Sequence, residues 1–128
     1  MEPIKEKVTF EEFKKMDIRV GKVMEIEPVP ETDKLLRCQI DFGPSFASSE
    51  ATAGEGSKGL VQIISGIRES YPEYEKLIGK SVLYIVNLEP RTIKGFESNG
   101  MLMAVDGLEG KPIFLIPDGE VNPGAKTH

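Results

Sequence analysis

The stretch that decides the fold is DIRVGKVMEIE, residues 17–27. Apolar and polar residues alternate along it, and the alternation shifts phase across Gly21. A glycine at such a shift predicts a bulge or a sharp bend within one long strand. Long first strands that bend in the middle are typical of small closed barrels, in which one strand pairs with neighbours on both sides. The stretch therefore predicts a small β-barrel.

A short helix is predicted immediately before this strand. Thr9 is a good N-cap and Glu12 lies three residues later, so that the two residues form a capping box. Residues 1–8 are then an N-terminal tail. The apolar residues of the helix recur at helical spacing, and we expect them to form a packing face. They are Phe10, Phe13 and Met16.

Four more strands are predicted after the long one, at residues 35–41, 60–66, 80–86 and 101–105, with a short apolar run at 113–116. One or two helical turns are predicted at 72–78, where Pro72 begins the turn and Gly79 follows it. Five strands with a small helix between the third and the fourth have the element order of an OB-fold. We therefore expect an all-β, five-stranded OB-fold barrel with a short N-terminal helix.

The length and composition of the chain predict one domain over residues 1–128. Residues 43–59 are rich in Gly, Ser and Ala, and we expect them to form a flexible loop within it. No apolar run approaches the roughly 20 residues that span a bilayer, and the N-terminus lacks the apolar region of a secretory signal. The single cysteine, Cys38, cannot form an internal disulfide. A cytoplasmic protein without a membrane partner is the expectation.

The chemistry of the common enzyme classes is missing from the sequence. The only histidine is the terminal residue, His128, and Cys38 is the only cysteine, so neither a metal cluster nor a Ser-His-Asp triad is expected. No phosphate-binding G-x-x-x-x-G-K-[ST] motif is present either. We therefore expect a binding module that is not an enzyme and that has no cofactor.

The candidate binding segment is NLEPRTIKGFESNGM, residues 87–101, between two predicted strands. It contains hydrogen-bond donors and cations beside small residues that let another backbone approach, a surface that suits phosphate, sugar or an unpaired base. The net charge of −5 argues against a broadly basic, nonspecific nucleic-acid binder. It is compatible with a shaped RNA site that has a local positive patch.

Six ordered blocks of the chain closely resemble the tRNA-binding domain family. They are DIRVGKV (17–23), ETDKLL (31–36), ISGI (64–67), LIGKSV (77–82), NLEPRTIKG (87–95) and ESNGM (97–101). That family includes the C-terminal domain of many bacterial methionyl-tRNA synthetases, free-standing structure-specific tRNA-binding proteins and the export-associated CsaA proteins. The resemblance runs from about Phe10 to the tail and so covers nearly the whole chain.

The resemblance implies an OB-fold homodimer that binds tRNA by shape and, beside an aminoacyl-tRNA synthetase, raises the local concentration of tRNA. The chain would be either a domain appended to methionyl-tRNA synthetase or a free-standing equivalent. A different function, that of a CsaA-like export chaperone for apolar peptide segments, stays open. A third reading is a structural dimerisation module of a synthetase. We expect the dimer to use apolar surface of the N-terminal helix and of residues 113–116.

The candidate tRNA-binding residues each have a structural alternative. RNA contact is favoured for Arg91 and Lys94 by their place in the family motif, and for Lys34 by its place in a turn near the same barrel face. For the other three residues, a structural role explains the sequence about as well as RNA contact does. Asn87 would cap a strand end, Ser98 would cap a turn, and Met101 would pack in the core. Arg19, in a strand beside Asp17, is interpreted as a structural ion pair.

Aromatic residues make up only 7% of the chain, and tryptophan is absent. A stacking platform of the kind that binds single strands would have to use Phe42, Phe46 or Phe96, and only Phe96 lies in the candidate segment. The scarcity of aromatic residues therefore favours recognition of a folded RNA over the threading of a single strand.

Overall fold

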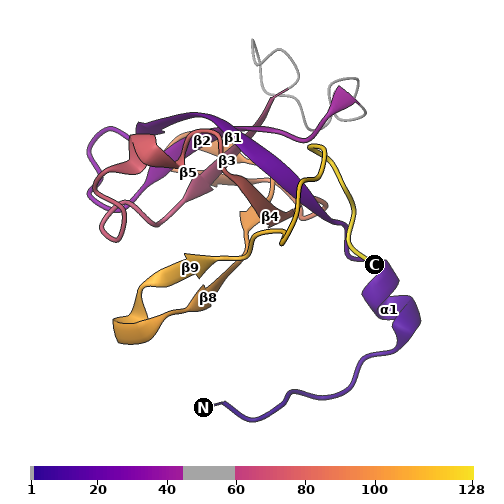
Figure 1. Ribbon diagram of the computed structural model, residues 1–128. Helices are drawn as coiled ribbons and strands as arrows, with labels where there is room; N and C mark the ends of the chain where they lie inside the picture. Colours follow the sequence, from indigo (N-terminus) through magenta and orange to yellow (C-terminus); the bar gives the residue numbers. More distant parts are fainter. Residues whose placement is uncertain (1, 45–59) are drawn as a thin grey trace.

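The computed structural model describes residues 2–44 and 60–128, and the predicted loop at 43–59 falls outside the described residues from position 45 onward. Its centre is an antiparallel sheet of five strands in the order β3-β2-β1-β4-β7 (Figure 1). The strands are β1 (Ile18–Pro28), β2 (Leu36–Asp41), β3 (Val61–Ser65), β4 (Ser81–Ile85) and β7 (Met101–Leu102). The sheet curls into a nearly closed barrel, which confirms the predicted OB-fold.

The long strand β1 pairs on both sides, as predicted. Its first half, from Ile18 to Lys22, pairs with β4, and its second half, from Lys22 to Pro28, pairs with β2. The β-bulge that bends the strand lies at Met24, however, and the prediction that it lies at Gly21 was wrong. Gly21 has another role, because a Cβ there would clash with Ile40 and lie 2.5 Å from a ring carbon of Phe42. The glycine lets the core pack against the strand.

The barrel closes through hydrogen bonds between β3 and residues 97–99. The amide of Asn99 donates to the carbonyl of Gln62 over 2.9 Å, and the Gln62 side chain donates to the carbonyl of Glu97 over 2.9 Å. The amide of Ile64 donates to the Ser98 hydroxyl oxygen over 3.0 Å. A serine side chain thus replaces one rung of the ladder that would otherwise join two backbones.

The core lies inside this barrel. Its fully buried side chains are Val29, Leu36, Ile40, Phe42, Val61, Ile63 and Val82. Phe42 meets Tyr84 edge-to-face, with ring centroids 5.4 Å apart. Cys38 is buried among these residues, and burial raises the pKa of its thiol to about 12. At neutral pH the thiol is therefore protonated and unreactive, as expected of a core cysteine.

Short elements surround the barrel. They are α1 (Phe10–Lys14), the 3-10 helices η1 (Tyr74–Leu77) and η2 (Leu108–Gly110), and four strands: β5 (Arg91–Ile93), β6 (Phe96–Ser98), β8 (Ala104–Asp106) and β9 (Pro112–Phe114). The predicted capping box of α1 is present, and η1 is the small helix predicted between the third and fourth strands. The predicted strand at 101–105 is divided at Met103, because its amide and carbonyl bond to Leu83 and Leu115 instead.

The helix α1 stands away from the barrel, close to the C-terminus, and the β8–β9 hairpin projects below the barrel with its tip pointing away from α1 (Figure 1). The predicted packing face of the helix has no cover within the described chain, since Phe10 is 70% exposed and Phe13 and Met16 are also exposed. No helix in residues 2–44 and 60–128 is long and apolar enough to cross a membrane.

Candidate nucleic-acid interface

The candidate segment folds into a hairpin that the sequence did not predict. Strands β5 and β6 pair in the register Arg91 to Ser98 and Ile93 to Phe96. The connection is the two-residue turn Lys94-Gly95, and both residues have positive φ, 51° and 85°. Such turns match the twist of a hairpin, and glycine is favoured in them. The signal that could have revealed the hairpin is a glycine-containing pair between two short runs of β-forming residues.

The hairpin presents its cations to solvent. Lys94 is exposed at the turn, and Arg91 is exposed at the opposite end of the hairpin, where it pairs with Ser98. Ser98 itself is only 3% exposed, and its hydroxyl accepts from Ile64 and also lies 3.4 Å from the carbonyl of Gly100. Burial and these bonds give Ser98 the position of an anchor that fixes Arg91 relative to the barrel.

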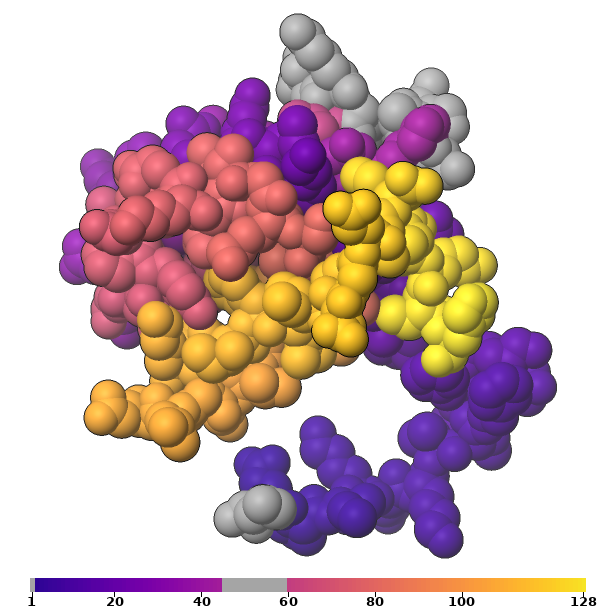
Figure 2. Space-filling view, in the orientation of Figure 1, coloured from indigo at the N-terminus to yellow at the C-terminus, as the bar shows by residue number. Residues whose placement is uncertain are grey.

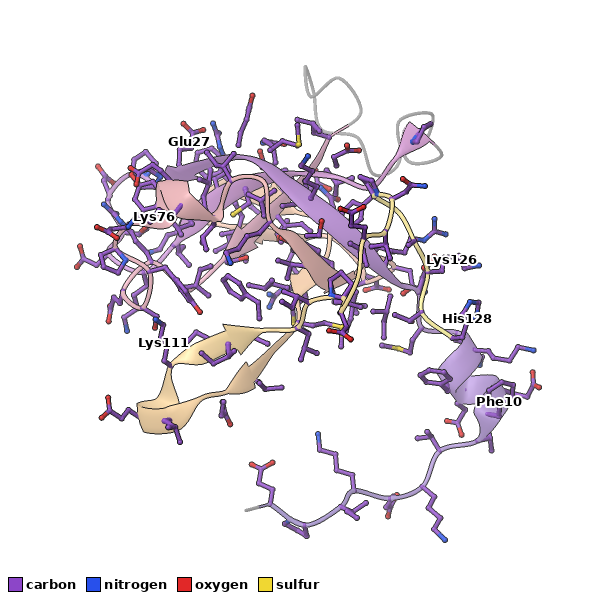
Figure 3. The ribbon with its side chains drawn as sticks, in the orientation of Figure 1. Phe10, Glu27, Lys76, Lys111, Lys126 and His128 are labelled. Carbon is purple, nitrogen blue, oxygen red and sulfur yellow. The ribbon has the colours of Figure 1, made fainter. Side chains whose placement is uncertain are left out.

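Asn87 lies at the other end of the barrel, beside α1. Its side-chain nitrogen donates to the carbonyl of Lys15 over 2.6 Å, and its side-chain oxygen accepts from the amide of Asp17 over 2.9 Å. The amide thus fastens the connection between α1 and β1 to the end of β4. It also lines a cleft of about 420 Å³ together with residues of α1 and of the C-terminal tail, including Phe10 and Lys126. Figure 3 shows Phe10, Lys126 and His128 grouped at this end and Glu27 at the opposite end.

Lys34 lies in the turn between β1 and β2, and this turn is held in place from outside. The Arg68 side chain donates to the carbonyl of Thr32 over 2.8 Å, and the Arg68 amide donates to the carbonyl of Lys34 over 3.1 Å. The Thr32 hydroxyl donates to the carbonyl of Val29 over 2.9 Å. The Lys34 side chain is exposed on this fixed turn.

The turn that carries Lys34 and the hairpin that carries Lys94 approach each other across β2. Residues 27–30, which lead into the turn, share a cleft with Arg37 of β2 and Phe96 of β6. The structure therefore brings three of the predicted residues, Lys34, Arg91 and Lys94, onto neighbouring elements. It does not bring Asn87 there.

Met101 is 44% exposed on β7, opposite Ile85 of β4, so that its thioether reaches solvent. The predicted ion pair of Arg19 is present, and its guanidinium donates twice to Asp17, over 2.8 and 3.0 Å. These hydrogen bonds raise the pKa of Arg19 above its usual value. The part of the chain that the structure describes contains no group of three acidic, histidine or cysteine side chains that could hold a metal ion.

Two further features of this surface were missed by sequence reasoning. The Arg37 guanidinium lies over the Phe96 ring, 4.8 Å from its centroid, and also pairs with Glu27. Two residues further along β2, the side chain of Gln39 donates to that of Gln62 over 3.0 Å. Both features depend on how the hairpin and β3 lie against β2. The alternation of β2 could have shown only that Arg37 and Gln39 face away from the core.

Comparison with known proteins assigns the chain to a family. The family model described as "Putative tRNA binding domain" matches residues 18–126. The methionine–tRNA ligase of Porphyromonas gingivalis is 43% identical over 125 residues, which are 98% of this chain and 16% of the ligase. The methionine–tRNA ligase of Methanococcoides burtonii is 39% identical over 124 residues, 97% of this chain and again 16% of the ligase. The chain thus spans about a sixth of the length of these curated relatives.

Solved structures resemble the whole chain. The crystal structure of a MetRS-related protein from Pyrococcus horikoshii has a TM-score of 0.78 and 31% identity, over 97% of this chain and 100% of that one. The chaperone CsaA from Bacillus anthracis has a TM-score of 0.75 and 28% identity, over 96% and 100% of the two chains.

Proposed function

Because this chain belongs to the tRNA-binding domain family, we propose that it is a non-catalytic module that binds folded tRNA by shape. The observation that carries the proposal is the match over residues 18–126 together with the exposed cations of a fixed hairpin, Arg91 and Lys94, in a chain of net charge −5. An acidic protein gains little from nonspecific attraction to RNA. A few well-placed cations then bind only an RNA whose phosphates have the matching spacing.

The candidate residues divide by their surroundings into contacts and anchors. We assign phosphate contacts to Arg91, Lys94 and Lys34, whose charged groups are exposed on elements that hydrogen bonds hold in place. Met101 offers its exposed thioether to an adjacent base or sugar. Asn87 and Ser98 contribute mainly by position, because their polar atoms already bond to backbone groups of the protein.

In the whole protein, the module would serve an aminoacyl-tRNA synthetase. The curated relatives are methionine–tRNA ligases of which the chain covers 16%, so the role we propose is that of an appended domain or a separate cytoplasmic partner. Either arrangement would hold tRNA near a catalytic domain and raise its effective concentration there.

We further propose that the module is a homodimer. Apolar side chains are exposed on α1 and on the β8–β9 hairpin, where Leu108 is 93% exposed and Ile113 42% exposed. Figure 2 shows open space between the N-terminal segment and this hairpin. Exposed apolar patches of this kind mark protein–protein interfaces, and a second copy would cover surfaces that this chain leaves uncovered.

A second candidate function is the binding of apolar peptide segments, since proteins named as the chaperone CsaA resemble the whole chain. It is less well supported, because the CsaA chains are 28% identical and the ligases up to 43%. Met24 and Met101 are exposed but line none of the clefts described above. A peptide that displaces bound tRNA from the protein would support a shared surface. Absence of any peptide binding would exclude this function.

The tRNA site is tested by removing the two cations of the hairpin, with Arg91→Ala and Lys94→Ala combined. The fold should be retained, because both side chains are exposed. Binding of tRNA should weaken, and the slope of log affinity against log salt should fall by about two units, one for each lost phosphate contact. The measurement is a titration of tRNA at several salt concentrations.

The matched control combines Lys5→Ala with Lys7→Ala, which removes the same charge from exposed positions in the N-terminal tail. The control should keep the wild-type slope. If the hairpin variant and the control have equal affinity and equal slope, the proposed site is wrong.

A further inference from the structure

A small cleft lies where the end of β1, strand β2 and the β5–β6 hairpin meet. Its volume is about 100 Å³, and its lining consists of Glu27, Pro28, Val29, Pro30, Arg37 and Phe96. Four of these six residues are apolar, and the two charged ones pair with each other. The cleft therefore offers an apolar interior with a planar cation at its wall.

Arg37 is fixed as a flat surface. Its guanidinium lies 4.8 Å from the centroid of the Phe96 ring, a cation–π contact, and its Nη2 pairs with the Glu27 carboxylate. Glu27 and Arg37 are also directly opposite each other in the antiparallel pairing of β1 and β2. The two contacts hold the guanidinium in one orientation, and a planar group in a fixed orientation is a surface on which another flat ring can stack.

The charges of the cleft favour an uncharged ligand group over a phosphate. Glu27 neutralises Arg37, so that a phosphate placed here would meet a carboxylate as well as a guanidinium. Beyond the cleft, the outward face of the sheet continues with the neutral amides of Gln39 on β2 and Gln62 on β3. A nucleobase is flat, carries no charge and is stacked by both aromatic side chains and guanidinium planes in RNA-binding proteins.

We propose that this cleft is a subsite for one unpaired nucleobase of the bound RNA, which stacks against Arg37 and Phe96. The inference rests on the proposed function, since it presumes that RNA lies on this face. The exposed Lys34 and Lys94 belong to the two elements that border the cleft, the β1–β2 turn and the β5–β6 hairpin. Phosphates bound by these lysines would bring the RNA onto this face, beside the cleft.

The test uses the full chain and compares tRNA affinity and its salt dependence for Phe96→Leu, Arg37→Lys and Phe96→Tyr. Stacking of a base on an aromatic residue has an effect of about tenfold in affinity. Phe96→Leu should lower tRNA affinity about tenfold with an unchanged salt slope, because no phosphate contact is removed. Arg37→Lys keeps the positive charge but removes the planar guanidinium, and it should lower tRNA affinity by a similar factor. Phe96→Tyr keeps the ring and should bind as the wild type does.

The outcomes separate this subsite from the proposed function. Suppose that the wild type binds tRNA and that its affinity falls as salt rises. If Phe96→Leu and Arg37→Lys then bind tRNA as tightly as the wild type does, the nucleobase subsite is refuted and tRNA binding stands. If Phe96→Leu lowers the salt slope as the removal of Arg91 and Lys94 does, Phe96 acts by positioning cations and the subsite is also refuted. If the wild type binds no tRNA, both proposals fail together. Thermal unfolding of each variant shows that lost affinity is not lost fold.

Discussion

At the scale of single residues, small polar side chains replace backbone groups at the points where the barrel is incomplete. Ser98 accepts the amide of Ile64 at the closure of the barrel, and Asn87 bonds to two backbone groups of the connection between α1 and β1. At the buried Ser98 an apolar residue would leave the amide of Ile64 unpaired, whereas the groups bonded to the exposed Asn87 could pair with water instead. Both residues lie in the segment that the sequence marked for RNA binding, so that one segment combines the residues to which we assign RNA contact with residues that hold the fold.

Replacing Ser98 with alanine should therefore reduce stability more than it reduces RNA affinity. The buried amide of Ile64 would lose its acceptor, at a cost of about 1–3 kcal/mol in the free energy of unfolding. The measurement is urea unfolding, with tRNA affinity determined well below the unfolding transition. Ser70→Ala, at a half-buried position remote from the barrel closure, should change stability by less than about 0.5 kcal/mol. A Ser98→Ala variant as stable as the wild type would show that this hydrogen bond does not support the barrel.

At the scale of elements, the sequence predicted the long bent strand and the order of the five barrel strands along the chain. The signal was the alternation of apolar and polar residues along β1, β2 and β4, which arises because each strand buries one face. The β5–β6 hairpin did not follow, because each of its strands has only three residues and only one of the six side chains is buried. Its pairing depends on the Lys94-Gly95 turn and on contacts with β3 that are remote in sequence.

The candidate site was predictable to the same extent. Arg91 and Lys94 could be named from their motif, and the approach of Lys34 to the same face followed from barrel topology. The stack of Arg37 on Phe96 could not be predicted, because it joins residues 59 positions apart (96 − 37) through a hairpin that was not expected. The bulge at Met24 was misplaced to Gly21 because a glycine required for close packing has the same sequence signature as one required for a bend.

At the scale of the whole molecule, the barrel has two distinct ends. One end carries the turn of Lys34, the cleft beside Glu27 and the hairpin, and the other carries α1, Asn87 and the C-terminal tail (Figure 3). This separation allows α1 to contact a second copy without covering the cations that we assign to RNA. A dimer would then present two such surfaces to one or two tRNA molecules.

The dimer is tested by Phe10→Ser combined with Phe13→Ser, which removes the two exposed rings of α1. Because these rings would be buried only in the dimer, the variant should shift to the monomer mass in light scattering while the barrel remains folded. The control is Ile78→Ser, which changes a side chain of similar exposure after η1 and should leave the mass at twice that of the chain. A wild-type protein that is monomeric at every concentration would contradict the proposed dimer.

The central claim is that this acidic barrel selects tRNA by its folded shape. The most direct measurement is a titration of total tRNA against the purified wild-type protein at two salt concentrations, with single-stranded RNA and duplex RNA as competitors. The account predicts binding that weakens as salt rises and that only folded tRNA competes away. Equal competition by single-stranded or duplex RNA, or no binding at low salt, would contradict it.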